Sequence, residues 1–339
     1  MEKGKQGGCL ALCCAAHFAV DFACAFLLLG LLPEGGNRPL WFLLYNFCAF
    51  ALQMPLGLLA DRYRRCPALA SAGCLLAAAA YLLPAFPLSA ALAAGLGNAL
   101  FHVGAGLAVL TEENGRCGPL GAFVSPGAIG LYAGSLLAGA GSGQGLSLLP
   151  PLALLAAAAG FLRLKTFPSL PGQVLFSLEL RPGELFPAVC IFLVVCLRSW
   201  LSLSLPLPWK GEAGWGLAFA CALALGKTLG GYAADRFGLL RAALLPLGFS
   251  ALLLPVCGLP VPGLLAVLLL NMSMPVTLWA AARLFPGAKG FSFGLLTFAL
   301  FIGFLPGYLS AGPALPAAGA AVGAAVSLLL LGAGLRRLP

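Results

Sequence analysis

The sequence predicts an all-α membrane protein with twelve transmembrane helices. Of its 339 residues, 61% are hydrophobic and only 9% are charged, whereas soluble domains carry about 25% charged residues. Most of the surface must therefore face lipid, where only helices or closed barrels satisfy every backbone polar group. Charge-free apolar runs such as 40–60 and 66–83 have the length of about 20 residues that a spanning helix needs. They are too long for the alternating strands of about 10 residues found in barrels.

A window long enough to cross ~30 Å of hydrocarbon divides the chain into twelve predicted spans. Their limits are 9–32, 40–60, 66–84, 88–110, 119–139, 147–162, 185–207, 213–234, 242–259, 261–282, 290–308 and 315–335. We expect three parts: an N-terminal six-helix bundle (1–162), a cytoplasmic linker rich in Pro and Gly (163–184) and a C-terminal six-helix bundle (185–339).

The basic residues indicate the orientation. With the N-terminus in the cytoplasm, all but four of the 19 Lys and Arg residues fall on the inner side, as the positive-inside rule requires. The exceptions are Arg38 and Lys210 outside, and Arg198 and Lys227 within spans. We therefore expect both termini in the cytoplasm and a multi-pass protein of the bacterial inner membrane. The net charge of +9 follows from topology and attraction to anionic lipids, so no nucleic acid is needed to explain it.

The two halves of the chain repeat a motif. The segment GLLADRYRR (57–65) follows the second span, and GGYAADRFGLLR (230–241) follows the eighth. The two Asp-Arg pairs are therefore separated by about half of the chain. Parallel repeats of this kind are a known transporter architecture.

These loops resemble the signature of the major facilitator superfamily, Gly-x-x-x-Asp-Arg/Lys-x-Gly-Arg/Lys-Arg/Lys. The matching positions are Gly57, Asp61, Arg62 and Arg65 in the first copy, and Gly231, Asp235, Arg236 and Gly238 in the second. The resemblance implies two six-helix bundles that work by alternating access, with this motif holding their cytoplasmic ends together in one state. It implies a secondary transporter of a small molecule and not an enzyme.

Two weaker resemblances bear on the direction of transport. Segments 17–21 and 97–106 are loosely similar to parts of bacterial fosmidomycin-resistance-type exporters. Ser125, Pro126, Gly127, Gly130 and Gly134 form a degenerate version of the glycine-proline motif of antiporters, and this version favours export. Glycines spaced for close helix packing would give the same pattern.

Ionisable residues inside spans cost roughly 3 kcal/mol or more, so each is a functional candidate. Asp21 lies near the middle of the first span, with His17 one turn earlier on the same helical face. A carboxylate beside an imidazole can exchange a proton, which is what a proton-coupled carrier needs. We therefore predict that Asp21 and His17 couple transport to protons, with a static polar contact as the alternative.

The other polar residues in spans are predicted to bind substrate. They are Asn98 and His102 in the fourth span, Arg198 and Trp200 in the seventh, Lys227 in the eighth, its first-half counterpart Gln53, and Asn271 in the tenth. The resemblance places spans 1, 4, 7 and 10 around a central cavity. One of the two deep cations is expected to pair with Asp21, which leaves a net positive site for an anionic or zwitterionic solute.

No metal site or cofactor is expected, and the proton is the expected coupling ion. The twelve cysteines lie mostly in apolar runs as small hydrophobic residues, and no Cys/His set has metal-ligand spacing. We expect a monomer whose partners are the bilayer and a small solute. Trp41, Trp209 and Trp215 are expected in the aromatic belt.

Three alternatives remain open. One is an integral membrane enzyme acting on a lipid-linked substrate, although the acidic pair 112–113 has no nearby histidine and no catalytic motif is present. The second is a uniporter or an uptake symporter. The third, a non-transporting sensor or scaffold, would leave the charges inside the spans unexplained.

Overall fold

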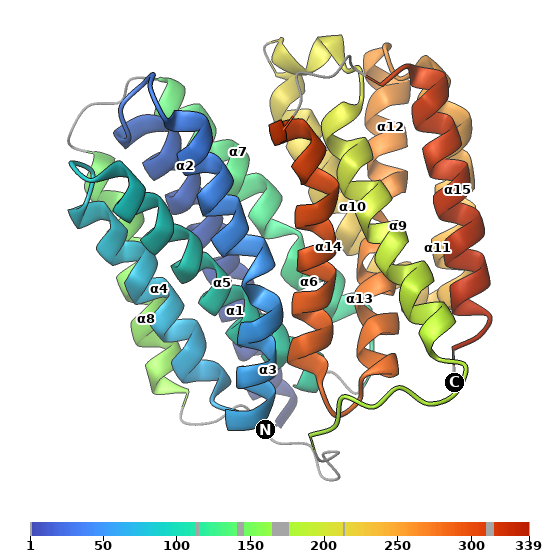
Figure 1. Ribbon diagram of the computed structural model, residues 1–339, viewed down its shortest axis with the longest axis horizontal. Coiled ribbons are helices and arrows are strands. Elements are labelled where there is room, and N and C mark those ends of the chain that lie inside the picture. Colours follow the sequence, from blue (N-terminus) through green and yellow to red (C-terminus); the bar gives the residue numbers. More distant parts are fainter. Residues whose placement is uncertain are drawn as a thin grey trace. The chain divides into compact units, whose positions relative to one another are not determined.

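The computed structural model describes residues 2–112, 115–140, 146–164, 176–212, 214–309 and 315–338, with the side chains of 2–6 and 112 left out. The described part is mostly helical and has no strand (Figure 1). Eleven helices are long and apolar enough to span a membrane, and the shorter apolar helix Cys66–Leu82 lies at the predicted third span. The twelve predicted spans are therefore present, and the all-α membrane fold is confirmed.

The helices are α1 (Glu2–Phe26), α2 (Arg38–Asn46), α3 (Gln53–Tyr63), α4 (Cys66–Ala79), α5 (Pro87–Glu112), α6 (Gly118–Val124), α7 (Pro126–Gly139), α8 (Leu149–Arg163), α9 (Leu185–Ser204), α10 (Trp215–Phe237), α11 (Leu239–Leu253), α12 (Pro260–Asn271), α13 (Ser273–Leu284), α14 (Lys289–Leu309) and α15 (Ala317–Leu335). Five-residue π-helical turns, Leu27–Leu31 and Phe47–Ala51, extend α1 and join α2 to α3. Pro126 separates α6 from α7 within the predicted fifth span, because a proline lacks the N–H that would continue the ladder.

The chain forms two compact units. Unit 1 comprises Met1–Asn114, Pro126–Phe176 and Lys289–Gly294, and unit 2 comprises Gly115–Ser125, Ser177–Ala288 and Leu295–Pro339. Each unit thus consists mainly of one half of the chain, with one short segment from the other half. Helix α6 belongs to unit 2, and the first turn of α14 belongs to unit 1.

In unit 1, glycines allow helices to approach closely. A Cβ on Gly73 of α4 would lie 2.2 Å from the backbone nitrogen of Phe101 in α5. Gly130 and Gly134 lie against α1 in the same way, since a Cβ on either would be 2.3 Å from a carbonyl oxygen of α1. Small residues at such contacts let backbones pack in lipid. Helix α5 is the most buried of the candidate spans, and it carries Asn98 and His102.

In unit 2, α10 is packed in the same manner. A Cβ on Gly226 would lie 2.2 Å from the carbonyl oxygen of Leu268 in α12, and one on Gly230 would lie 2.1 Å from that of Met272. A Cβ on Gly121 of α6 would lie 2.5 Å from the carbonyl oxygen of Lys227. The described helices of unit 2 therefore form a bundle with α10 against α6, α11, α12 and α13.

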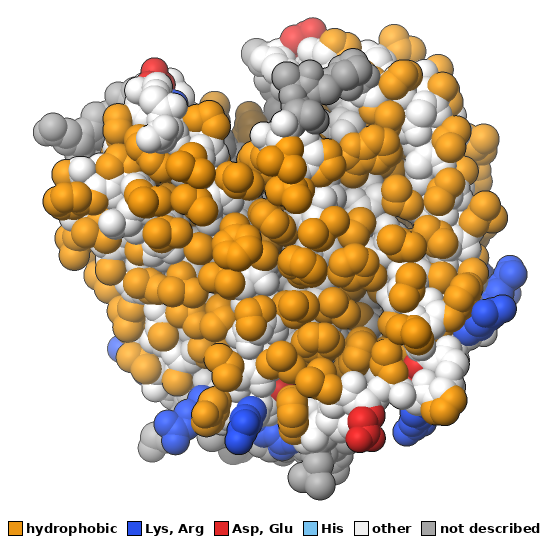
Figure 2. Space-filling model, in the orientation of Figure 1, with side chains coloured by type: hydrophobic (Ala, Val, Ile, Leu, Met, Phe, Trp, Pro, Cys, Tyr) orange, Lys and Arg blue, Asp and Glu red, His pale blue; other side chains and the backbone are white. Residues whose placement is uncertain are grey.

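The surface of each unit is hydrophobic. Figure 2 shows hydrophobic side chains covering most of the visible face. Large apolar side chains point outward from many helices; Leu82 is 83% exposed and Leu252 is 75% exposed. Such a surface would be costly in water, and it fits the lipid exposure that the composition predicts.

Candidate functional site

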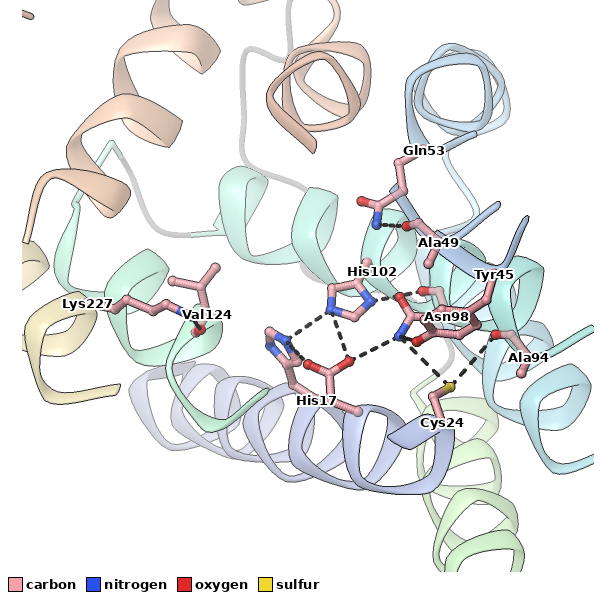
Figure 3. Close-up of polar contacts among 11 residues, drawn as sticks. His17, Cys24, Tyr45, Ala49, Gln53, Ala94, Asn98, His102, Val124 and Lys227 are labelled. Atoms are coloured by element: carbon pink, nitrogen blue, oxygen red, sulfur yellow. Dashed lines mark hydrogen bonds and ion pairs between the residues drawn. The ribbon is translucent and has the colours of Figure 1, made fainter. Parts of the chain in front are cut away.

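In unit 1, α1 and α5 bring three titratable side chains together. His17 and Asp21 are one turn apart on α1, and Nε2 of His17 lies 3.3 Å from Oδ2 of Asp21. His102 of α5 places its Nε2 2.9 Å from Nε2 of His17 and 4.0 Å from Oδ1 of Asp21 (Figure 3). We call these three residues the His-Asp cluster. Its side chains are largely buried, with exposed fractions of 7%, 21% and 12% for His17, Asp21 and His102.

Hydrogen bonds around the cluster indicate which ring nitrogens of its histidines carry a hydrogen. Nδ1 of His102 lies 2.9 Å from the carbonyl oxygen of Asn98, and a carbonyl only accepts, so this nitrogen carries a proton. The other nitrogen, Nε2, then has a lone pair whenever His102 is neutral. Two Nε2 atoms at hydrogen-bonding distance need one proton between them. With Nδ1–H on His102, Nε2 of a neutral His17 donates this hydrogen bond to Nε2 of His102, next to the Asp21 carboxylate.

Asn98 anchors the carboxylate. Its side-chain amide donates to Oδ1 of Asp21 at 3.0 Å and is 3.3 Å from the hydroxyl oxygen of Tyr45. The thiol of Cys24 lies at the edge of this group, 4.0 Å from the Asn98 nitrogen (Figure 3). The two residues of the i,i+4 pair in α5 thus have different contacts: Asn98 donates to the Asp21 carboxylate, and His102 contacts His17 of α1.

Gly127 in the first turn of α7 closes over the cluster. A Cβ at this position would lie 2.3 Å from both Oδ2 of Asp21 and Nε2 of His17. No side chain fits there without moving the cluster. The glycines of the degenerate antiporter motif are thus required by close packing, as the alternative interpretation of that motif proposed.

We expect Gly127→Ala to destabilise the protein by about 1–3 kcal/mol, because the added methyl group overpacks a buried polar site. Gly139→Ala in the same helix is the matched control, since a Cβ at Gly139 meets nothing within 4 Å. Thermal unfolding of the purified variants in detergent measures both. Equal midpoints for the two variants would contradict the packing described here.

In unit 2, α9 carries a buried cation. Arg198 is 5% exposed, and its Nη1 donates to the hydroxyls of Ser273 and Thr277 on α13 at 3.3 and 3.4 Å. Both hydroxyls donate in turn to backbone carbonyls, at 2.9 and 2.8 Å, so their lone pairs face the guanidinium. No carboxylate among the described residues lies within 4 Å of Arg198. Asp21 belongs to unit 1 and Arg198 to unit 2, so the expected pairing of the two stays a prediction.

The remaining predicted substrate residues, Lys227, Asn271 and Trp200 in unit 2 and Gln53 in unit 1, each have their own surroundings. Nζ of Lys227 donates to the carbonyl oxygen of Val124 at 3.1 Å (Figure 3). Asn271 is buried and donates to the carbonyl of Val267 at 2.8 Å, and Trp200 is half-buried. Gln53 is 1% exposed, and its Oε1 is buried without a hydrogen-bond partner in the part of the chain that the structure describes. None of these contacts tests a role in binding solute.

The repeated motif makes the same contact twice. Asp61 accepts hydrogen bonds from the backbone N–H groups of Gly290 and Phe291, at 2.7 and 2.8 Å, where α14 begins. Asp235 accepts from Cys117 and Gly118, at 2.7 and 2.8 Å, where α6 begins. The first N–H groups of a helix have no partner within the helix, and a carboxylate satisfies them well.

The motif glycines permit the contact between each aspartate and the start of the facing helix, whereas the motif arginines are exposed. A Cβ on Gly57 would lie 2.1 Å from the carbonyl oxygen of Gly290, and one on Gly231 would lie 2.5 Å from that of Cys117. Arg62, Arg65 and Arg236 are exposed. The sequence did not reveal the partners of the two aspartates, because they lie 229 and 118 residues away along the chain.

We expect Asp61→Asn and Asp235→Asn each to lower stability by about 1–2 kcal/mol, because the amide replaces one charged acceptor by a donor facing N–H groups. Arg62→Gln, an exposed change in the same motif, should stay within ~0.5 kcal/mol of wild type. Thermal unfolding in detergent checks all three. An aspartate variant as stable as Arg62→Gln would show that the contact is dispensable.

Comparison with solved structures identifies the fold. A variant of the E. coli fucose:proton symporter FucP superimposes with a TM-score of 0.71, at 14% identity over 97% of this chain and 98% of that one. This chain has the major facilitator fold.

Two further structures agree with that assignment. FucP in an outward conformation gives a TM-score of 0.66 at 15% identity, covering 97% and 98% of the two chains. A bacterial homologue of the iron transporter ferroportin, in an outward-facing state, gives 0.64 at 19% identity and 98% coverage of both. No protein-family profile and no curated protein matches the sequence. At these identities the likeness extends to the fold, and the sites rest on this chain's own residues.

Proposed function

We propose that this chain is a proton-coupled secondary active transporter of a small anionic or zwitterionic organic solute. The His-Asp cluster is the observation that carries this proposal. It combines a carboxylate with two hydrogen-bonded imidazoles inside a membrane-spanning bundle. Intramembrane groups of this kind are costly to bury and mark ion pathways.

The cluster supports a single exchangeable proton per cycle. With Asp21 ionised and both imidazoles neutral, the cluster carries one negative charge. Adding one proton makes the cluster neutral, because one ring of the hydrogen-bonded pair becomes an imidazolium beside the Asp21 carboxylate. A second added proton would place two cationic rings 2.9 Å apart, which repulsion disfavours. His102, first expected to bind substrate, is therefore assigned to proton coupling with His17 and Asp21.

Arg198 supports an anionic group on the solute. No carboxylate in the described part of unit 2 pairs with this guanidinium, and a buried charge is costly unless a counterion, here proposed to come from the solute, compensates it. Its planar fork matches a carboxylate or another oxyanion in bidentate geometry. The hydroxyls of Ser273 and Thr277 hold one nitrogen of the fork and set its orientation.

The two motif aspartates support alternating access. Asp61 and Asp235 each hold the first turn of a helix that comes from the other half of the sequence. If the hydrogen bonds of Asp61 and Asp235 break together, the first turns of α14 and α6 are released in one state of the transport cycle. The gating residues proposed from the motif are thus Asp61 and Asp235 with Gly57 and Gly231.

Direction, orientation and assembly are the finer parts of the proposal. We propose export from the bacterial cytoplasm in exchange for protons, by a monomer in the inner membrane with both termini inside. The charge asymmetry of the loops supports the orientation, and the loose similarity of segments 17–21 and 97–106 to exporters favours export. Uptake by symport and uniport are the alternatives. An enzyme is not favoured, since the fold is that of transporters.

A screen in proteoliposomes tests the proposed function. An internal pH dye reports proton movement when pools of organic anions, zwitterions, cations and neutral metabolites are added outside. We expect anions or zwitterions to change the internal pH, and the sign distinguishes symport from antiport. Proton movement with cations alone would overturn the proposed substrate class. Silence in every pool, with radiolabelled exchange also absent, would overturn the proposal of a transporter.

A further inference from the structure

The His-Asp cluster has the make-up of a metal site. We infer that His17, Asp21 and His102 bind a divalent transition-metal ion. One ligand atom from each residue lies within 4.8 Å of the other two. This goes beyond the proposed function, and it departs from the expectation of no metal site. That expectation rested on sequence spacing, which cannot bring together His17 and His102, 85 residues apart.

The distances suit a single ion. Ligand nitrogens and oxygens lie about 2.0–2.2 Å from zinc-sized metals, so two atoms on one ion are about 2.9–3.5 Å apart. Nε2 of His17 is 2.9 Å from Nε2 of His102 and 3.3 Å from Oδ2 of Asp21. The third edge, from Nε2 of His102 to Oδ1 of Asp21, is 4.0 Å, and a small rotation of the carboxylate closes it.

A second layer of hydrogen bonds orients the ligands. Metal-binding histidines usually donate their other ring nitrogen to a carbonyl or carboxylate, which fixes the tautomer. Nδ1 of His102 meets the carbonyl of Asn98 at 2.9 Å, so its Nε2 lone pair faces the cluster. The Asn98 amide holds Oδ1 of Asp21 at 3.0 Å. A single residue thus positions two of the three ligands.

The ligand set defines the class of metal. Two imidazoles and one carboxylate suit Fe(II), Co(II), Ni(II) or Zn(II), whereas Mg and Ca ions prefer oxygen ligands alone. Three protein ligands leave coordination positions for water or another ligand. The partial exposure of the Asp21 side chain, 21%, leaves one side of the cluster accessible. An ion on these atoms would replace the hydrogen that joins Nε2 of His17 to Nε2 of His102.

Cobalt binding tests the inference on the purified, metal-stripped protein in detergent, with no transport measured. We expect one Co²⁺ per chain, seen by its visible d–d absorption and displaced by Zn²⁺. Absence of thiolate-to-cobalt absorption would assign the ligands to nitrogen and oxygen and not to the cysteines. Asp21→Asn and His102→Gln should each weaken binding at least ~10-fold, and Asn98→Ala by about 10- to 100-fold through loss of ligand orientation.

Cys24→Ala is the matched control, since its thiol borders the cluster without being a ligand, and it should bind as wild type does. Only variants whose thermal stability matches that of the wild type, and which elute as a single species in size-exclusion chromatography, are compared. No Co²⁺ binding by wild type, or undiminished binding by both ligand variants, overturns the inference. Because no solute or proton flux enters this assay, its failure leaves the proposed proton coupling standing.

Discussion

Asp21→Asn is expected to abolish proton-coupled flux while the protein remains folded. The asparagine keeps the size and hydrogen-bonding reach of the aspartate, so contacts with Asn98 and His17 have a polar partner of the same shape. It removes the charge that changes when the cluster gains a proton. Removing a positioned proton-transfer group costs on the order of 10²-fold or more. The measurement is solute-dependent pH change in proteoliposomes, with each variant reconstituted at matched protein content.

The control for Asp21→Asn is the exchange of labelled for unlabelled solute across the membrane, because this exchange involves no net movement of protons. If Asp21 serves only in coupling, the variant should still exchange labelled solute for unlabelled solute across the membrane. Coupled flux at the wild-type level in Asp21→Asn would remove Asp21 from the mechanism. Loss of exchange as well as coupling, with wild-type thermal stability, would assign Asp21 to solute binding instead.

Arg198→Gln is expected to weaken binding of an anionic solute by about 10- to 100-fold, because hydrogen bonds to a charged group contribute about 1.5–3 kcal/mol. Glutamine keeps a donor that reaches toward the hydroxyls of Ser273 and Thr277, and it lacks the charge and the planar fork. Arg198→Lys should recover only part of the affinity, since lysine keeps the charge without bidentate geometry. The apparent KM for uptake or exchange measures these effects.

Thr277→Val is the matched control for the arginine variants. It removes one hydroxyl that orients the guanidinium, at 3.4 Å, and keeps the charge, so a smaller loss of affinity is expected. An unchanged KM in Arg198→Gln, or a solute that proves to be a cation, would remove Arg198 from substrate binding. The buried guanidinium would then need another counterion.

The transmembrane helices could be predicted from sequence because hydrophobicity and length decide them. All twelve predicted spans have a helical counterpart among the described residues, and most limits agree within a few residues. The break between α6 and α7 lies at Pro126, where the proline predicts a bend or break in the fifth span. The length and hydrophobicity of a segment thus predict where a helix lies, while a single proline predicts where this helix is interrupted.

Tertiary contacts were beyond the sequence. Candidate residues could be selected by the cost of burying them, which singled out His17, Asp21, His102 and Arg198. The spacing along one helix predicts the pairing of His17 with Asp21, but the contact of His102 with His17 could not be predicted, because the two residues lie on different helices. The expected aromatic belt is wrong at Trp209, which is 2% exposed and donates to the carbonyl of Cys257 at 2.9 Å. A tryptophan near a span end can face either lipid or the bundle, and the sequence does not distinguish these.

The central claim is that this chain couples solute movement to protons through the His-Asp cluster. It is tested most directly by imposing a pH gradient across proteoliposomes with equal solute on both sides. We predict that the wild-type protein drives labelled solute away from equal distribution until the pH gradient is dissipated, and that Asp21→Asn does not. Equal distribution throughout in the wild type, with rapid solute exchange still present, would contradict the account and identify a uniporter.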